Sequence, residues 1–297
     1  MFYGLYHMLT TLGTVPADFR NAARKQIGRY NTSSIIDTTI VSVHPTDQNT
    51  FEATDISGKK YTSRKVVLGT GLRDVLPNTP GLDQAWGKGV YWCPWCDGYE
   101  HRDQPFGILG GFQDIIGSVL EVYSTLNSDI IAFLNGTQTP DQEAILQKSH
   151  PDWKPIVEAY NIRLDNRTIT SIERIQNGED HKDDEGRQFD IFRLHFTEGE
   201  PIDRNALITN YPTEQRSSLP ADMGLKLLGS KIDTQTKSGL RTSMPGVWAI
   251  GDANSDNSTN VPHAMFSGKR SAVFSHGEFT PSCHFSMAAI GDGGVVC

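Results

Sequence analysis

From Phe106 onward the sequence alternates β-strand patterns with helix patterns, and this order constrains the fold more than any other feature. The pattern gives a strand at 106–111, a helix at 114–125, a strand at 129–134, and helices at 140–149 and 151–160. Two parallel strands need a crossover between them, usually a helix, so the order predicts a βαβ unit and an α/β domain. Later strand patterns at 192–196 and 206–210 are expected to complete this domain.

Strand patterns also dominate the region before this domain. A helix is predicted at 19–30, and strands at 34–43, 51–55 and 61–68. The last strand ends in the apolar run 66–68 and leads directly into Gly69-Thr70-Gly71, a turn at which the backbone can lie close to a ligand. Prolines and a glycine in 77–81 then predict a linker.

A strand and a helix are predicted again near the C-terminal end. The strand at 246–250 ends in Gly251-Asp252, and the helix covers 261–275. Before the strands at 192–196 and 206–210, the charged run at 179–185 predicts a solvated loop.

The length and charge of the chain indicate how many domains it has and which kinds of partner it lacks. A chain of 297 residues is long enough for about two domains. Its 27 Lys and Arg face 35 Asp and Glu, for a net charge of −8, and no basic run is present, so we expect no nucleic-acid partner. No apolar run approaches the roughly 18 residues of a membrane span, and the first residues lack a signal-peptide pattern. We therefore expect no membrane association and a cytoplasmic location.

Cys93-Pro94-Trp95-Cys96 is the feature with the clearest chemistry. Two intervening residues let both sulfur atoms reach disulfide distance, which favours a redox pair. The alternative is two buried thiols that pack as small apolar groups. A zinc site would need a second pair of ligands, which His101 and His150 do not form by their spacing, so we predict no metal. A carboxyl at position 97 could carry a proton to a departing thiolate, and Gly98 would permit the turn that presents it.

Three separated motifs resemble one family of enzymes. The string CPWCDGYE at 93–100 resembles the redox centre of low-molecular-weight thioredoxin reductases, and most closely that of fungal FAD-dependent dithiol oxidases related to gliotoxin oxidoreductase. KVVLGTGLRDVLPNTPG at 65–81 resembles the strand and turn before the family's first crossover between domains, and MPGVWAIGD at 244–252 resembles the strand that returns to the flavin. HMLTTLG at 7–13 resembles a loop of the flavin domain.

The resemblance implies two nested Rossmann-like dinucleotide-binding domains, each built from three layers (ββα), with FAD as cofactor and a homodimer as the assembly. On that plan 1–81 and 236–277 form the FAD-type domain, 82–235 form the inserted NAD(P)-type domain with the CxxC, and 278–297 form a tail. The family begins with a strand, a GxGxxG turn and a helix that hold the FAD pyrophosphate. This sequence starts after them, so the resemblance implies an N-terminally truncated first domain.

Functional residues follow from the matched motifs. The resemblance implies that Cys96 faces the flavin, that Cys93 exchanges with substrate, and that Asp97 is the acid–base group. The FAD contacts that it implies are His7, Thr10, Gly69, Thr70, Gly71, Asp252, Val261, Pro262 and His263. His101 and His263 are further candidates for a base, although a single histidine is more often a structural residue. Trp92 and Trp95 could line an apolar substrate cleft or belong to the core.

The inserted domain departs from the reductase pattern at its nucleotide-binding turn. Phe112 stands where a third glycine would let the backbone approach a pyrophosphate, and the strand that ends at Asn135 offers no Arg or Lys for a 2′-phosphate. Fungal dithiol oxidases also lack this NADPH clamp. The sequence therefore favours an FAD-linked oxidase that acts on a small dithiol of fungal secondary metabolism, with oxygen as acceptor. The alternative is a flavin-free derivative that is inactive or serves in binding or non-redox catalysis.

Overall fold

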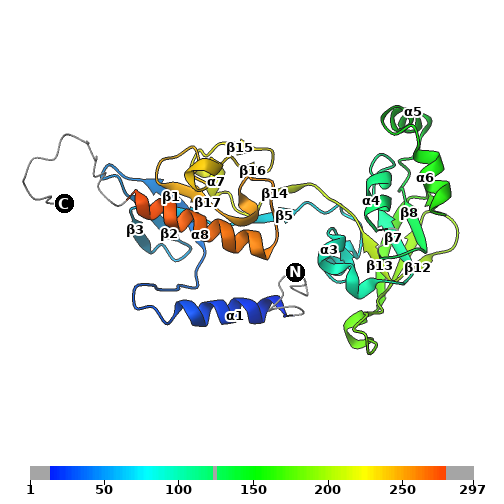
Figure 1. Ribbon diagram of the computed structural model, residues 1–297, viewed down its shortest axis with the longest axis horizontal. Helices are drawn as coiled ribbons and strands as arrows, with labels where there is room; N and C mark the ends of the chain where they lie inside the picture. Colours follow the sequence, from blue (N-terminus) through cyan, green and yellow to red (C-terminus); the bar gives the residue numbers. More distant parts are fainter. Residues whose placement is uncertain (1–13, 123–125, 279–297) are drawn as a thin grey trace, which may run out of the picture. The chain divides into compact units, whose positions relative to one another are not determined.

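The computed structural model describes residues 14–122 and 126–278. They form two compact units, each built from two chain segments (Figure 1). Unit 1 contains the described residues up to Ile35 and 74–212, and unit 2 contains 36–73 and those from Thr213 onward. The chain passes between the units three times: between Ile35 and Ile36, at β5 (Leu72–Asp74), and just before β14 (Thr213–Gln215). β5 and β14 pair as a two-stranded sheet.

The passages at β5 and β14 lie earlier in the sequence than predicted. The sequence pattern placed them after residues 81 and 235, whereas the units divide after residues 73 and 212. Pairing of β5 with β14 brings the two passages together. Proline and glycine content reveals a linker but not the hydrogen bonds between two distant segments. The linker at 77–81 therefore lies inside unit 1.

Unit 1 contains a five-stranded parallel sheet of order β6-β13-β7-β8-β9. The strands are β6 (Val90–Tyr91), β7 (Phe106–Leu109), β8 (Ile130–Phe133), β9 (Arg163–Asp165) and β13 (Ala206–Ile208). The predicted βαβ unit is confirmed, because α4 (Ile115–Val122) connects β7 to its parallel neighbour β8. The predicted strand at 206–210 is also in this sheet, as β13 between β6 and β7.

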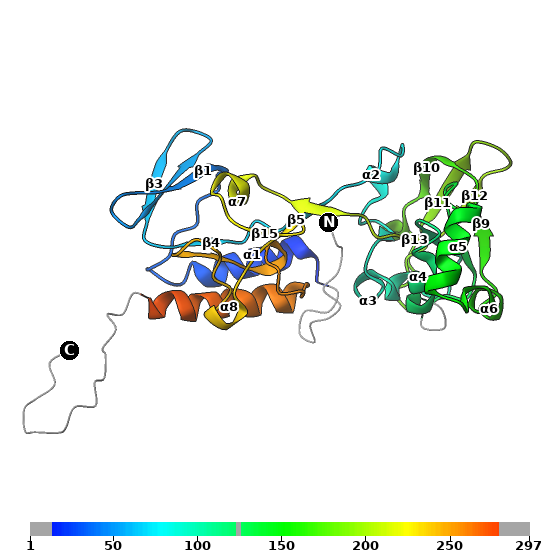
Figure 2. The same cartoon turned by 90° about the horizontal axis from the view of Figure 1, so that it is seen from above.

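A second sheet lies on one face of the parallel sheet, and helices lie on the other face. The antiparallel strands β10 (Ile169–Gln176), β11 (Ile191–Phe196) and β12 (Ile202–Arg204) form the second sheet. Alternate side chains of a strand point to opposite faces, and Ile131 and Phe133 of β8 pack with Phe192 of β11. Ile130 and Ala132 of β8 instead pack in the core that contains α4 residues. Unit 1 therefore has the three layers expected of the fold class (Figure 2).

Helices and short turns complete unit 1. They are α1 (Pro16–Ile27), α2 (Leu82–Ala85), α3 (Pro94–Asp97), the 3₁₀ turn η1 (Tyr99–His101), α5 (Pro140–Ser149), α6 (Trp153–Ala159) and η2 (Gly178–Asp180). α1 buries none of its residues, which confirms the predicted surface helix. The predicted strand at 192–196 is β11, but it belongs to the antiparallel sheet and not to the parallel one.

Unit 2 combines a small antiparallel sheet with a parallel strand pair. The sheet has the order β1-β2-β3, from β1 (Ile40–Pro45), β2 (Phe51–Asp55) and β3 (Lys60–Ser63). β4 (Val66–Leu68) pairs in parallel with β17 (Val247–Ala249), with Leu68 opposite Ala249. The remaining elements are α7 (Leu219–Asp222), β15 (Leu227–Leu228), β16 (Lys231–Ile232), η3 (Thr236–Ser238), η4 (Gly251–Ala253) and α8 (Val261–Gly277).

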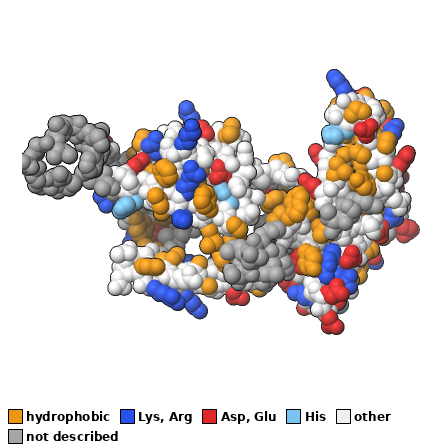
Figure 3. All heavy atoms as spheres, viewed as in Figure 1, with side chains coloured by type: hydrophobic (Ala, Val, Ile, Leu, Met, Phe, Trp, Pro, Cys, Tyr) orange, Lys and Arg blue, Asp and Glu red, His pale blue; other side chains and the backbone are white. Residues whose placement is uncertain are grey.

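Two strand predictions for unit 2 are wrong in their extent. The run 61–68 was predicted as one strand, but it forms β3 and β4, which belong to different sheets. The pattern at 34–43 predicted a strand, but residues 34–39 have no regular structure, and β1 begins at Ile40 because its pairing with β2 starts there, opposite Asp55. Within the described ranges, every helix is too short or too polar to cross a membrane. On the face shown in Figure 3, basic side chains are interspersed with acidic and apolar ones.

Candidate active site

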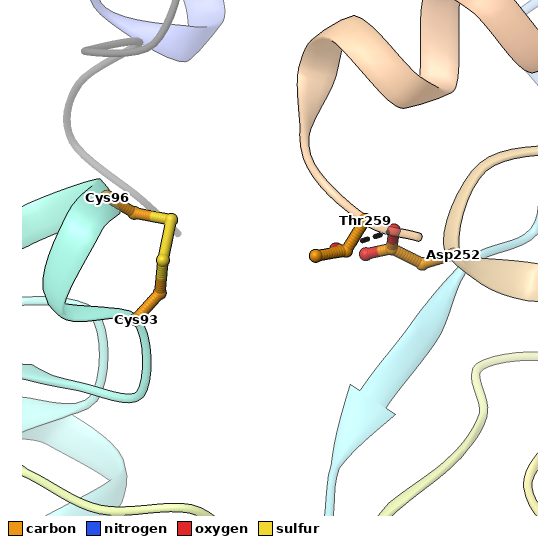
Figure 4. Close-up of a disulfide and its surroundings, with 4 residues drawn as sticks. All are labelled: Cys93, Cys96, Asp252 and Thr259. Atoms are coloured by element: carbon orange, nitrogen blue, oxygen red, sulfur yellow. Dashed lines mark hydrogen bonds between the residues drawn. A yellow bond between two sulfur atoms is a disulfide. The ribbon is translucent and has the colours of Figure 1, made fainter. Parts of the chain in front are cut away.

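The CxxC segment forms a single helical turn in unit 1. Cys93 is the N-cap residue of α3 and has extended backbone angles, while Pro94 occupies the first helical position, where a missing N–H costs no hydrogen bond. Cys93 and Cys96 are joined by a disulfide (Figure 4). The predicted pairing is confirmed, and the alternative of two separate buried thiols is excluded for this structure.

The two sulfur-bearing residues differ in exposure. Cys93 is only 7% exposed, and Cys96 is half-buried. Trp95, between them, is 64% exposed and therefore not a core residue, which leaves the substrate-lining role as its open interpretation. Gly98 follows with φ −77°, so it is not required for an unusual backbone angle. A Cβ at this position would instead collide with the Pro94 carbonyl oxygen and with Leu126.

Asp97 ends α3 and has the properties of a proton carrier. Its Oδ2 atom is buried and has no hydrogen-bond partner among the described residues. Burial disfavours the charged carboxylate, and the neighbouring Glu100 adds negative charge, so the pKa of Asp97 is raised to about 7. A carboxyl group with this pKa can both give and take a proton near neutral pH.

His101 is buried in a structural setting. It is 4% exposed, its ring stacks on Tyr91 with centroids 5.7 Å apart, and its Nδ1 lies 3.2 Å from the Gln188 carbonyl oxygen. Burial lowers the pKa of His101, which favours the neutral ring. These contacts support the structural interpretation of this histidine over a catalytic one.

A second set of predicted residues comes together in unit 2. Because β4 and β17 are parallel and adjacent, the loops after their carboxyl ends lie at the same sheet edge, which is where α/β folds bind ligands. The first loop is Gly69-Thr70-Gly71, and the second begins with Gly251 and Asp252. Gly251 has φ +61°, a left-handed conformation that favours glycine, and its N–H donates to Ser267 Oγ of α8 at 2.9 Å.

Two polar atoms at this edge have no hydrogen-bond partner among the described residues. The Thr70 Oγ1 and His263 Nε2 atoms are both buried, and His263 Nε2 lies 3.4 Å from Asp256 Oδ1. Asp252 is half-buried, and its Oδ1 accepts from Thr259 Oγ1 at 2.9 Å (Figure 4). An unpartnered buried hydroxyl at the same sheet edge as a carboxylate fits a polar ligand such as the hydroxyl-rich chain of FAD.

The amino end of α8 adjoins this edge. Asn260 is the N-cap, and its Oδ1 accepts from the His263 N–H at 3.0 Å. Val261 and Pro262 form the first helical positions, as the motif match implied. Their contacts with FAD stay predictions. The remaining two predicted FAD contacts, His7 and Thr10, lie outside the described residues.

The turn after β7 in unit 1 is closed by the protein itself. The Phe112 N–H, which in a dinucleotide site would face a phosphate, donates to Thr137 Oγ1 at 2.9 Å. The Phe112 side chain is 1% exposed and meets Trp153 edge to face, with centroids 5.1 Å apart. A Cβ on Gly111 would lie 3.2 Å from Asp114 Oδ2, so a carboxylate stands close to the same turn. Sequence reasoning identified Phe112 but missed Thr137, whose only signal is its place just after Asn135-Gly136.

Comparisons with known proteins agree with these motifs. No protein-family model matches the chain. A protein of Arthroderma benhamiae named "Probable thioredoxin reductase" is 47% identical over 284 residues, which cover 92% of this chain and 70% of the relative. Thioredoxin reductase aclD of Aspergillus oryzae is 30% identical over 247 residues, 80% of this chain and 72% of the relative.

The fold comparison is consistent with the sequence relatives. The crystal structure of thioredoxin reductase from Streptococcus pyogenes superposes with a TM-score of 0.73, at 15% identity, over 94% of this chain and 85% of that one. At this identity the likeness concerns the fold. The two fungal relatives show that this chain is an enzyme of the thioredoxin reductase-like FAD/NAD(P) oxidoreductase family.

Proposed function

We propose that this enzyme oxidises a small dithiol through the Cys93–Cys96 disulfide, with FAD as cofactor and oxygen as the final acceptor. The observation that carries the proposal is the closed turn after β7. The Phe112 N–H donates to Thr137, the Phe112 side chain is in the core, and the Asp114 carboxylate lies close to Gly111 of the same turn. A bound NADPH pyrophosphate needs free backbone N–H groups and no nearby negative charge.

The chemistry in unit 1 is thiol–disulfide exchange. A substrate thiolate attacks Cys93 Sγ, the bond between the two cysteine sulfurs breaks, and Cys96 leaves as a thiolate that takes the proton of Asp97. The second substrate thiol, once deprotonated, attacks the sulfur bound to Cys93 and releases that cysteine as a thiol. The substrate loses two electrons and two protons, which the dithiol pair gains.

Reoxidation of the dithiol needs a cofactor, and the residues of unit 2 fit FAD. Asp252 and the unpartnered Thr70 hydroxyl would hold the cofactor's polar chain at the edge formed by β4 and β17. When bound, FAD supplies a two-electron acceptor that can be reoxidised by oxygen, so that the net reaction converts dithiol and oxygen into disulfide and hydrogen peroxide. Asp97 gives a proton to the Cys96 thiolate when the disulfide is reduced and takes one back when the dithiol is reoxidised.

Oxygen uptake with dithiothreitol as substrate, measured with and without NADPH, tests this proposal. We expect oxygen consumption and peroxide formation that depend on the dithiol and change little on addition of NADPH. Cys93→Ser should lower the rate by at least about 10³-fold, because the attacked sulfur is gone. Glu158→Ser, at an exposed position of α6, is a control that should leave the rate unchanged. Saturable NADPH oxidation at micromolar cofactor would contradict the choice of acceptor.

Serine variants of the two cysteines test which sulfur the substrate attacks. In Cys96→Ser the Cys93 thiolate can attack a linear disulfide probe, 2-hydroxyethyl disulfide, one half of which leaves as a thiolate. Cys96 is then absent and cannot resolve the mixed disulfide, so mass spectrometry should find the other half on Cys93. Cys93 is the less exposed of the two cysteines in this structure, so exposure alone would favour attack at Cys96, and an adduct on Cys93 would distinguish the two assignments. A stable adduct on Cys96 in Cys93→Ser, with none on Cys93 in the other variant, would reverse the assignment.

A further inference from the structure

A small pocket in unit 1 adjoins the CxxC turn. Its walls come from the turn before β6, from α3 and η1, and from β10 with the segment that follows it. The titratable side chains that line it are Lys88, Tyr91, Asp97, Glu100, His101, Arg174 and Glu179. The thiol chemistry described above uses only Asp97 of this set.

Exposure changes along the pocket. Glu179 is exposed, and Lys88 and Arg174 are half-buried. Tyr91, Glu100 and His101 are 1%, 5% and 4% exposed. The pocket therefore runs from solvent to buried groups next to Asp97.

Two buried polar atoms at the inner end have no hydrogen-bond partner among the described residues. They are the Tyr91 Oη atom and the Asp97 Oδ2 atom. A buried hydroxyl or carboxyl without a partner costs about 1–3 kcal/mol. Water that enters a polar pocket between such groups would remove that cost. The inner end is thus suited to hold water in contact with Asp97.

The charges around the inner end favour a retained proton. Arg174 donates from Nε to Asp190 Oδ1 at 2.7 Å and from Nη2 to Asn177 Oδ1 at 2.7 Å, so its charge is already paired. The neutral form of His101 is favoured by burial. Burial, and after it the charges of Asp97 and Glu100, raises the pKa of Tyr91, which keeps its phenol protonated. Lys88 is the remaining cation in the lining. Two neighbouring carboxyl groups in such a setting hold a proton that one alone would release.

We propose that Glu100 is a positioning residue for the proton of Asp97, and that the pocket is the route by which this proton passes between Asp97 and solvent. The inference rests on the proposed function. When the disulfide is reduced, Asp97 gives its proton to the Cys96 thiolate, and water in the pocket relays a proton from solvent back to the carboxylate, which replaces the one that the substrate thiol lost to solvent. When the dithiol is reoxidised, the proton returns to Asp97 and a proton leaves through the same pocket.

Stopped-flow reduction of the disulfide by dithiothreitol, followed by tryptophan fluorescence between about pH 5.5 and 9, isolates this step. The dithiothreitol thiolate increases with pH, and protonated Asp97 decreases above pH 7, so the rate of the parent protein should level off above that value. In Glu100→Gln the onset of this plateau should move down by about one pH unit, because one negative charge is lost. Glu158→Gln removes the same charge from α6, outside the pocket, and should leave the profile in place.

Addition of a small carboxylic acid tests whether the pocket is the route of the proton. In Glu100→Ala, formic acid that enters the enlarged pocket should restore at least half of the lost reduction rate. The same addition should not help Asp97→Asn, in which no carboxyl receives the proton.

The outcomes separate this inference from the proposed function. Uniform slowing of Glu100→Gln at every pH, with no shift of the plateau, would overturn the inference, since a structural role alone gives that result. A shift without formic acid rescue would also overturn it, because the pocket would not be the route. If dithiothreitol fails to reduce the disulfide of the parent protein, the proposed function itself fails.

Discussion

The turn after β7 in unit 1 and the turn after β4 in unit 2 have the same place in their sheets but differ in hydrogen bonding. The protein itself satisfies the first turn, whereas the second keeps a buried hydroxyl without a partner among the described residues. Each follows a strand that pairs in parallel with a neighbour, and each contains two glycines. In unit 1 the amide of Phe112 is bonded to Thr137 and its ring is buried. In unit 2 the Thr70 hydroxyl is buried with no partner among the described residues, and a Cβ on Gly71 would meet nothing within 4 Å.

The difference shows how a dinucleotide-type fold can keep one ligand site and lose another. A turn binds a phosphate only while its donors are free. Once the protein satisfies those donors itself, the turn gains stability and loses its ligand. Substitutions in the two turns should therefore have effects of different sign, and four experiments test this contrast.

Phe112→Ala should have the largest effect. Removal of a fully buried ring that packs on Trp153 leaves a cavity, so the free energy of unfolding should fall by about 3–5 kcal/mol. Chemical denaturation followed by far-UV circular dichroism measures this loss. Val273→Ala, on the exposed side of α8, should cost far less. A loss below about 1 kcal/mol for Phe112→Ala would mean that the turn is not part of the core.

Asp252→Ala tests the open site in unit 2. One charged hydrogen bond contributes about 1.5–3 kcal/mol, so FAD affinity should fall by about 10- to 100-fold. Asp97→Asn is the matched control, because it removes a carboxylate from the thiol site and should leave FAD affinity nearly unchanged. Titration of FAD into both variants, followed by flavin fluorescence, separates the two roles. Equal losses, or no FAD binding to the parent protein, would favour the flavin-free alternative.

Thr137→Val should destabilise the closed turn. The substitution removes the acceptor of the Phe112 N–H and leaves that amide unsatisfied, so the unfolding free energy should fall by about 1–2 kcal/mol. Denaturant titration measures the change. Thr139→Val, the N-cap of α5, is a control for loss of a hydroxyl hydrogen bond in the same unit and should cost about 1 kcal/mol. An unchanged stability in Thr137→Val would mean that water replaces the hydroxyl and that the turn is not sealed.

Thr70→Val should have the smallest effect on stability and the opposite sign. The variant loses a buried hydroxyl that has no partner among the described residues, so the FAD-free protein should become up to about 1 kcal/mol more stable. FAD affinity should fall by a few-fold. Thermal unfolding with and without FAD reports both changes. A clear loss of stability in the FAD-free protein would show that Thr70 already has a partner there.

The sequence predicted the parallel sheet of unit 1 because its strands follow simple patterns. β7 and β8 are short apolar runs next to a helix pattern, and such runs are typical of strands buried on both faces. The disulfide could be predicted for a similar reason, since the spacing of Cys93 and Cys96 is a local property. Local patterns of this kind need no knowledge of the rest of the chain.

Features that depend on distant partners could not be predicted. β10 has apolar side chains at Ile169, Ile172 and Ile175, which is helix-like spacing, and irregularities in its pairing with β11 displace the alternation expected of a strand. The bond from Phe112 to Thr137 spans 25 residues and leaves no local pattern. The pocket next to Asp97 likewise takes its lining from segments that are far apart in the sequence.

The pairing of β5 with β14 has a consequence for how the whole chain assembles. Residues 74–212 are an insertion between the two chain segments of unit 2, and the pairing of β5 with β14 holds the two ends of this insertion together. The entropy cost of closing a loop grows only with the logarithm of its length, and a loop that folds into its own core no longer behaves as free chain. Unit 2 can therefore form around an insertion larger than itself, and the insertion can vary in length or be exchanged for another domain without changing the sheet that receives it.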